Sequence, residues 1–452
     1  MTTRKVPHLI VNYTSTTIFI FSIFLVCASL SASGYIVYRP AVFDPSLKLG
    51  IVYRGNFTPI IHELNQLSPV TQFSFLGSND ILLLSKLDGK VLRVQNHTLL
   101  PESLLDVNVT NQWESGLLGI AISKNAGKVY VFLYYTESMN GDVTNSTSTE
   151  PSYNKLYRYE LVNNKLVNPK LLFALPSPNH YSHIGGGLQI GPDNNLYLTV
   201  GDMHGEKNET TRMTVENYKD GAIPDGRAGI LRFTQDGEVV GAGTLGENYP
   251  LNHYYAYGIR NSFGIDFDPV SGKLWDTEDG PKSGDEINLV EPGHNGGWNK
   301  IQGMRKTAID PEEEPKSAGS ATNDSLDLVD FGGKGKYSSP EFVFSKRAAP
   351  TALKFLDSRQ LGEKYQNDLF VASFNLGEIY DFDLNENRTK LESSNKGNNT
   401  IMEKLDVKSV MFAQGLGQIT DMDVGPDGNL YILSNYLDTP TIFRISSINI
   451  TK

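Results

Sequence analysis

Residues 191–202 read GPDNNLYLTVGD, a turn rich in Gly, Asp and Asn that leads into a short apolar strand. The same turn and strand recur at irregular spacing in residues 77–85, 124–135, 268–280, 363–373 and 425–435. Gly, Asp and Asn accept the positive φ of tight turns, and aromatic and β-branched residues suit a pleated, half-buried sheet. Six copies of one unit indicate a fold built by repetition.

Neighbouring segments extend each copy to three or four strands. Apolar strands precede several copies, as in residues 116–122, and further strands follow, as in residues 153–161 and 377–384. Closing six such units into a ring protects the strand edges by radial repetition. The pattern therefore predicts an all-β fold, a six-bladed β-propeller over residues 41–452, in preference to a pair of β-sandwiches.

The composition excludes several classes of protein. The 452 residues include 51 Asp and Glu against 40 Lys and Arg, so the formal net charge is −11. A chain this acidic is a poor partner for nucleic acid. Cys27 is the single cysteine, which rules out an intrachain disulfide and a zinc site built from cysteines.

The N-terminal segment predicts a membrane anchor. Residues 18–37 are mostly apolar, and no charge lies between Lys5 and Arg39. Such a stretch is long enough to span a hydrocarbon core of about 30 Å as a helix. Arg4 and Lys5 place the N-terminus in the cytoplasm and the body outside it. We therefore expect residues 1–40 to form a cytoplasmic stub and a signal-anchor transmembrane helix. A cleaved signal peptide, which would release a secreted body, is the alternative.

Potential N-glycosylation sites support an extracytoplasmic body. Asn-x-Ser/Thr sequons occur at Asn56, Asn96, Asn108, Asn145, Asn208, Asn323, Asn387, Asn398 and Asn449. Such sequons agree with a glycoprotein surface outside the cytoplasm. A general bias of the composition toward Asn and Thr is the alternative explanation.

The densest chemical signal lies in residues 182–202. His183 precedes three glycines and a strand, and Asp202 ends the next strand. Two antiparallel neighbours would bring the two side chains together, and a carboxylate on one ring nitrogen leaves the other nitrogen as a base. A structural hydrogen bond between the two residues is the alternative.

Two further stretches offer charged and oxygen-rich groups. Arg260 and Asn261 stand between a glycine turn and an apolar strand, where an Arg can hold an oxygen anion or form a packed ion pair. Residues 278–299 combine the carboxylates of Glu278, Asp279, Asp285 and Glu286 with Gly and Pro. Such oxygen-rich loops suit Ca²⁺, although this one is no EF-hand and a solvated acidic loop is the alternative.

Four linked motifs resemble the glucose/sorbosone dehydrogenase family. They are WESGLLGIAI (113–122), HIGGGLQIGPDNNLYLTVGD (183–202), YGIRNSFGIDFDP (257–269) and EDGPKSGDEINLVEPGHNGGW (278–298). The resemblance covers approximately residues 60–440. It implies a soluble quinoprotein aldose sugar dehydrogenase that uses pyrroloquinoline quinone (PQQ) and Ca²⁺ on a six-bladed propeller.

The resemblance assigns roles at the reactive end of the site. His183 matches the catalytic base and Asp202 the acid that orients it. Arg260 and Asn261 match the pair near the reactive carbonyl of the quinone. Glu114 falls where the family places a polar contact to substrate or cofactor, often Gln.

The same resemblance assigns the metal ligands. The carbonyls of Gly280 and Pro281 match ligands of a Ca²⁺ that also touches PQQ. Glu286 matches a ligand of a second, structural Ca²⁺.

Three cofactor positions depart from the family. Asn375 stands where the family usually has a Lys, and Gln418 and Thr420 stand where it usually has two Arg. Those cations would pair with the three carboxylates of PQQ, and unpaired carboxylates in a closed site are costly. Lys282, beside Pro281, offers partial compensation.

These features predict an oxidoreductase that converts the anomeric carbon of an aldose sugar to a lactone and passes electrons to an external acceptor. The alternative is a non-enzymatic extracytoplasmic propeller that binds a protein or a glycan, because a fold does not determine a function. A hydrolase of the propeller class, such as a lactonase, is a third candidate.

Overall fold

The computed structural model describes residues 29–30, 36–37, 39–55, 69–110, 112–138, 152–177, 182–203, 212–281, 283–303, 305–306, 316–317, 327–344, 347–392 and 409–448. The chain divides into two compact units, Met1–Arg39 and Pro40–Lys452.

In the first unit, β1 (Ser29–Leu30) pairs antiparallel with β2 (Ile36–Val37). These two short strands are the described part of the span 18–37 that we expected to be a helix, and its other residues lie outside the described ranges. Among the residues described, no helix has the length and apolar character to cross a membrane. The anchor helix is thus not confirmed.

The second unit consists of sheets whose strands largely follow one another along the chain. The first sheet contains β5 (Val70–Gly77), β6 (Asp80–Ser85), β7 (Lys90–Gln95), β8 (Thr98–Leu99) and β9 (Leu105–Asp106). The second contains β10 (Leu117–Asn125), β11 (Lys128–Ser138), β12 (Ser152–Val162) and β13 (Lys165–Ser177). The third contains β14 (Leu188–Ile190), β15 (Leu196–Val200), β16 (Gly229–Phe233), β17 (Tyr254–Tyr257), β21 (His294–Asn295) and β25 (Lys336–Tyr337).

The remaining sheets follow the same order. The fourth contains β18 (Ser262–Phe267), β19 (Leu274–Glu278), β20 (Glu286–Val290) and β26 (Phe342–Val343). The fifth contains β27 (Pro350–Phe355), β28 (Leu369–Ser373), β29 (Ile379–Phe382), β30 (Met411–Gln414) and β3 (Ala41–Val42). The sixth contains β31 (Gln418–Val424), β32 (Leu430–Tyr436), β33 (Thr439–Ser447) and β4 (Leu47–Arg54). A small sheet holds β22 (Ile301–Gln302), β23 (Arg305–Lys306) and β24 (Lys316–Ser317).

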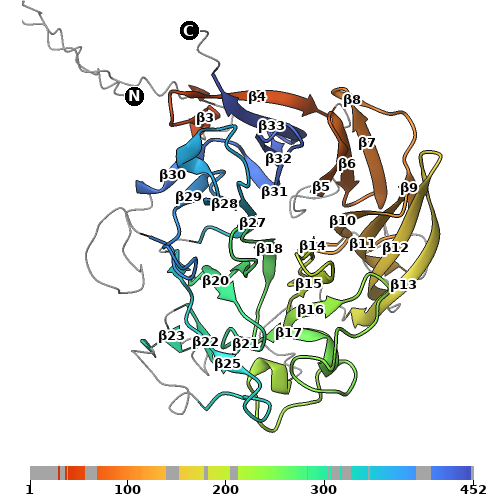
Figure 1. Cartoon of the computed structure of the whole chain (residues 1–452), viewed down its shortest axis with the longest axis vertical. Helices are drawn as coiled ribbons and strands as arrows, with labels where there is room; N and C mark the ends of the chain where they lie inside the picture. The colour runs from red at the N-terminus through yellow and green to blue at the C-terminus, as the bar shows by residue number, and fades with distance from the viewer. Residues whose placement is uncertain are drawn as a thin grey trace, which may run out of the picture. The chain divides into compact units, whose positions relative to one another are not determined.

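The described helices are single 3₁₀ turns: η1 (Thr214–Glu216), η2 (Leu251–His253) and η4 (Glu363–Tyr365). The second unit is therefore all-β, and its sheets are arranged around a common centre (Figure 1). The innermost strands β5, β10, β14, β18, β27 and β31 contact one another in this order, and β31 returns to β5. The predicted all-β propeller is confirmed, whereas the count of six blades stays a prediction.

Each copy of the sequence repeat ends on the second strand of one sheet, namely β6, β11, β15, β19, β28 or β32. Two copies have the same turn chemistry. Asp193 accepts a bond of 3.2 Å from the Asn195 amide and one of 3.0 Å from the Tyr197 hydroxyl. Asp427 accepts bonds of the same lengths from Asn429 and Tyr431. These Asx turns fix the entry into the second strand.

The second strands form the core between neighbouring sheets. All five residues of β15 and all five of β28 are buried. Their large apolar side chains pack against the adjacent sheets, as Leu196 and Leu198 do against Phe132 and Tyr134 of β11. Burial on both faces explains why these segments are nearly continuous apolar runs.

The chain closes the ring with its N-terminal strand. β4 pairs antiparallel with β33 over the register Leu47↔Ser447 to Arg54↔Thr441. β3 likewise completes the edge of the fifth sheet by pairing with β30. The last sheet therefore contains strands from both ends of the propeller.

Candidate active site

The predicted base lies in a glycine-rich segment that precedes β14. His183 has φ +56°, and a Cβ atom on Gly185 would approach the Thr199 carbonyl oxygen to 2.5 Å. A Cβ atom on Gly187 would approach the Phe263 carbonyl oxygen to 2.3 Å. The glycines are therefore required because this segment passes directly against β15 and β18.

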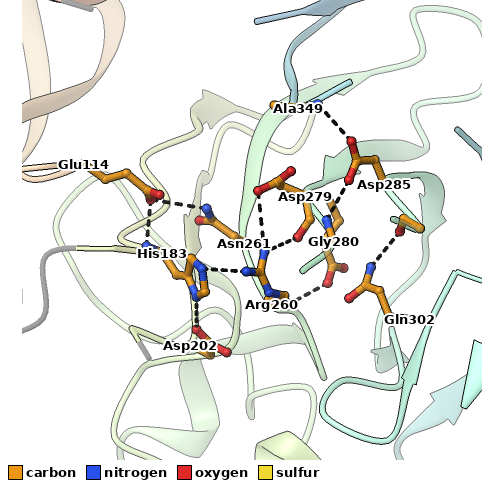
Figure 2. Close-up of polar contacts among 12 residues, drawn as sticks. Glu114, His183, Asp202, Arg260, Asn261, Asp279, Gly280, Asp285, Gln302 and Ala349 are labelled. Carbon is orange, nitrogen blue, oxygen red and sulfur yellow. Dashed lines mark hydrogen bonds and ion pairs between the residues drawn. The ribbon is translucent and has the colours of Figure 1, made fainter. Parts of the chain in front are cut away.

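The structure brings His183, Asp202 and Arg260 together, as predicted (Figure 2). The Nδ1 atom of His183 lies 2.7 Å from Oδ1 of Asp202, and its Nε2 atom lies 2.7 Å from Nη2 of Arg260. Because a guanidinium only donates, Nε2 accepts this bond. The proton of the neutral ring is therefore on Nδ1 and is donated to Asp202, which leaves Nε2 as the basic atom.

Arg260 is held by the loop that follows β19. Its Nη1 donates to the Asp279 carbonyl at 2.6 Å and lies 3.5 Å from the Asp279 carboxylate. Its backbone amide donates to Glu278 Oε1 at 2.7 Å. With 8% of its side chain exposed, Arg260 presents a fixed positive charge next to the imidazole.

Glu114 connects the two sides of the site (Figure 2). Its Oε2 accepts bonds from the backbone amides of His183 (2.7 Å) and Ile184 (3.3 Å) and from the side-chain amide of Asn261 (3.2 Å). Glu114 thus positions the backbone of His183 and the amide of Asn261.

The sequence analysis missed Lys86, which is 3% exposed and donates to the Trp113 carbonyl. Burial lowers the pKa of Lys86 to about 8, and the nearby Glu114 carboxylate acts in the opposite direction. Lys86 directly follows the first copy of the repeat, but no local pattern distinguishes it from an exposed lysine.

Trp298 was also missed, although it belongs to a quoted motif. Its indole Nε1 donates to Oδ2 of Asp202 at 2.7 Å, and the Arg260 guanidinium lies 5.6 Å from the centre of its ring. The sequence places Trp298 far from both partners, so only the fold reveals these contacts.

The predicted calcium loop is tied to the next sheet. The Gly280 amide donates to Asp285 Oδ1 at 2.9 Å, and Asp285 Oδ2 accepts from the amides of Ala348 (2.7 Å) and Ala349 (2.9 Å). Within the described residues, Oδ1 of Asp279 is buried without a hydrogen-bond partner. Burial and the neighbouring Asp285 raise the pKa of Asp279 to about 6. A buried, unsatisfied carboxylate oxygen beside the Gly280 and Pro281 carbonyls fits the ligand preference of Ca²⁺.

Glu286 lies in a second buried acidic group on β19 and β20. Glu286 is directly opposite Glu278, and its Oε1 accepts bonds from Gln302 Nε2 at 2.9 Å and from the Gly303 amide. Burial raises the pKa of Glu286 to about 8, and burial with the adjacent Glu286 raises that of Glu278 well above its usual value. Among the described residues, no group of three or more His, Cys, Asp and Glu side chains has the arrangement of a metal site.

The three neutral positions lie apart from the His183 contacts. Gln418 accepts from Asn435 at 3.0 Å, Asn375 is exposed, and Thr420 Oγ1 is buried without a partner in the described structure. No hydrogen bond or ion pair between described residues joins these side chains to His183 or Arg260. The donor set therefore fits the reactive end of a quinone and a cation, but it lacks the cations expected for the carboxylates of PQQ.

Comparison with known proteins identifies the family of this chain. The family model described as Glucose / Sorbosone dehydrogenase matches residues 67–442. Quinoprotein glucose dehydrogenase B of Acinetobacter calcoaceticus is 31% identical over 249 residues, which are 50% of this chain and 49% of that protein. The chain thus matches about half the length of that relative.

Two further similar proteins match over more of their length. Aldose sugar dehydrogenase YliI of Escherichia coli (strain K12) is 23% identical over 367 residues, covering 80% of this chain and 86% of that protein. The PQQ-bound aldose sugar dehydrogenase of Streptomyces coelicolor shares the fold, with a TM-score of 0.60, 19% identity and coverage of 90% and 100%. With the family model matching most of its length, the chain belongs to the glucose/sorbosone dehydrogenase family.

Proposed function

We propose that the protein is a sugar oxidoreductase that oxidises the anomeric carbon of an aldose to a lactone, using PQQ and Ca²⁺. The observation that carries the proposal is the neutral His183 ring held between a carboxylate and a guanidinium. The family membership and the dehydrogenase relatives support the reaction class.

The residues of this chain act on the substrate proton and on the charge that develops. Nε2 of His183 takes the proton of the anomeric hydroxyl, and Asp202 stabilises the imidazolium that results. Arg260 gives up its contact with Nε2 as this proton arrives, and its guanidinium would then stabilise the negative charge on the acceptor that takes the hydride from the anomeric carbon. When bound, PQQ supplies the two-electron acceptor, and the protein supplies orientation and charge.

Candidate residues for holding PQQ and Ca²⁺ surround the base. Arg260 and Asn261 would hold the reactive end of PQQ through their N–H groups, because quinone oxygens only accept hydrogen bonds. Gly280, Pro281 and Asp279 would hold the Ca²⁺. The carboxylate end would meet Asn375, Gln418 and Thr420 in place of cations, so we expect PQQ to bind more weakly here than to a site that has those cations.

We also propose six blades, one for each sheet of four or more strands, and an extracytoplasmic location. The ring of innermost strands supports the blade count. The apolar span 18–37 and the exposed sequon residues Asn96, Asn108 and Asn387 support the location. In this arrangement the body stays on the outer face of the cell membrane and passes electrons to an external acceptor.

A second candidate is a propeller that binds a protein or glycan without catalysis. The neutral residues Asn375, Gln418 and Thr420 favour it, because they remove the charges that would retain PQQ. In this function the His183 cluster would serve only to stabilise the loop.

The decisive experiment titrates the purified full-length protein with PQQ in Ca²⁺ and follows the absorption spectrum of the quinone. We expect saturable binding and sugar-dependent reduction of an artificial dye. Saturable binding without any dye reduction across a panel of aldoses would contradict the dehydrogenase. Absence of PQQ binding would favour the binding propeller.

A further inference from the structure

Trp298 touches both partners of the candidate base and touches them in different ways. Its indole N–H donates to Oδ2 of Asp202 at 2.7 Å, while Oδ1 of the same carboxylate lies 2.7 Å from Nδ1 of His183. Its ring lies against the guanidinium of Arg260, whose Nη2 is 2.7 Å from Nε2 of His183 (Figure 2 shows this His183 contact). One side chain thus connects both flanks of the imidazole.

The indole bond fixes the rotation of the Asp202 carboxylate. A carboxylate can present either oxygen to a histidine, and a donor on one oxygen leaves the other one directed at the ring. Asp202 is fully buried, so water does not replace a missing donor without cost. Trp298 therefore determines which oxygen receives the Nδ1 proton.

The ring contact restrains Arg260. A guanidinium stacked on an indole face is attracted by the ring quadrupole and loses rotational freedom. The same guanidinium is bound on another side by the Asp279 carbonyl at 2.6 Å. Trp298 and Asp279 together direct Nη2 at the imidazole.

The backbone of Trp298 is held in place by buried hydrogen bonds. Its amide donates to the Gly258 carbonyl at 2.9 Å, and its carbonyl accepts from Asn217 Nδ2 at 2.8 Å. Asn217 and Asn295 exchange a pair of amide bonds of 2.9 and 2.8 Å. The indole is consequently a rigid support, with 8% of Trp298 exposed.

We propose that Trp298 is a positioning residue that orders the Asp202–His183–Arg260 array for proton removal from the sugar. This inference rests on the proposed dehydrogenase function for its role, but its geometry is testable without activity. Trp298 does not act on the substrate directly. It acts through the carboxylate and the guanidinium that it contacts.

The first test reads the indole signal in the unliganded protein. The chain has three tryptophans, so ¹⁵N-Trp labelling gives three indole N–H resonances. The signal that disappears in Trp298→Phe is assigned to Trp298. If Trp298→Phe does not fold, the single variants Trp113→Phe and Trp275→Phe assign the other two signals and so identify that of Trp298 by elimination. We expect Asp202→Asn to shift the Trp298 signal and to leave the other two in place. An unmoved Trp298 signal would overturn the proposal.

The second test reads the imidazole. In ¹⁵N-His-labelled protein we expect an Nδ1–H signal of His183 that is protected from exchange with water and absent from His183→Ala. Trp298→Phe keeps a ring but removes the donor, so this signal should be lost to exchange. Retention of the protected signal in Trp298→Phe would also overturn the proposal.

Trp275→Phe is the matched control. Trp275 is fully buried, and its indole nitrogen has no hydrogen-bond partner within the described structure. Its substitution removes a buried indole without affecting the array, so the His183 signal should stay as in the wild type.

Steady-state kinetics distinguish a positioning role of Trp298 from a purely structural one. At metal sites, loss of a group that orients a histidine costs about 10-fold to 100-fold in activity, and we take the same range for His183. We expect Trp298→Phe to lower kcat in this range with little change in KM, and Trp275→Phe to leave both at wild-type values. Wild-type kcat and KM in Trp298→Phe would contradict positioning. If the wild type oxidises no sugar while both NMR effects occur, the proposed function fails and the ordering role of Trp298 stands.

Discussion

The side chains around His183 and those around Gln418 differ in charge. Both ring nitrogens of His183 have charged partners at 2.7 Å, and Glu114 fixes the backbone beside them. In the second region, Gln418 and Thr420 are neutral, and the Thr420 hydroxyl is buried without a hydrogen-bond partner among the described residues. Under the proposed function, His183 belongs to the part of the site that performs chemistry and Gln418 to the part that retains the cofactor, and only the second part lacks the expected charges.

The largest expected effect tests the paired side. His183→Ala should lower kcat for sugar oxidation by about 10²–10⁴-fold, because general base catalysis typically contributes that much. PQQ affinity, measured by spectral titration, should stay near the wild-type value. Asp202→Asn should cost less, since it disturbs tautomer and orientation without deleting the base. His97→Ala, which changes an exposed histidine, is the control. Full activity in His183→Ala would refute the mechanism.

The neutral side is tested by restoring charge. Each charge-assisted hydrogen bond contributes about 1.5–3 kcal/mol, which is about 10-fold to 100-fold in affinity. The double variant Gln418→Arg, Thr420→Arg should therefore tighten PQQ binding by at least the lower figure, measured by the same titration. Gln418→Met with Thr420→Val is the neutral control. Equal PQQ affinity in the two double variants would remove the basis of the comparison.

Removal of Ca²⁺ tests whether the buried Glu286 carboxylate is part of a metal site, with the exposed Glu291 as the comparison. A ligand bound only to the native state adds about 2.7 kcal/mol at a hundredfold excess over its Kd. We expect a chelator to lower the Tm, and Glu286→Gln to reduce that shift. Glu291→Gln, which changes an exposed carboxylate of the same sheet region, should keep the full shift. An unchanged Tm with chelator would exclude a structural Ca²⁺ at Glu286.

The smallest effect concerns Asp368, which directly precedes β28, the strand before the turn that contains Asn375. Burial and the neighbouring Asp381 and Asp383 raise the pKa of Asp368 to about 8. Between about pH 4 and 8 the folded protein keeps a proton that the unfolded chain releases, so stability falls as pH rises through this window. Asp368→Asn should flatten this slope in thermal melts, whereas the exposed Asp357→Asn should not. A slope that Asp368→Asn leaves unchanged would show that Asp368 does not titrate in this way.

The propeller was predictable because its signal is repeated and local. The Gly/Asp-Asn turns and apolar runs occur in every copy, and each copy ends on the second strand of a sheet. The pairing of β21 with β17 and β25 was not predictable, because these short parallel contacts join segments that carry no strand pattern.

The charged residues at the centre of the site could be predicted from the sequence, but the buried residues that contact them could not. His183, Asp202 and Arg260 stand in motifs, and the structure joins them. Lys86 and Trp298 act through tertiary contacts alone, since burial and not sequence context makes their groups important. The neutral residues Asn375, Gln418 and Thr420 were recognisable in the sequence as departures from the family. Only the structure shows that the Thr420 hydroxyl is buried without a hydrogen-bond partner among the described residues.

The pairing of β4 with β33 determines when the sixth sheet can form during synthesis of the chain. β4 (Leu47–Arg54) is synthesised long before its partner β33 (Thr439–Ser447). β4 therefore stays without this partner until β33 has left the ribosome. Contacts between such distant segments slow folding, because the long intervening chain must be ordered first. A nascent chain stalled before residue 439 would leave β4 exposed and able to pair with a strand from another molecule.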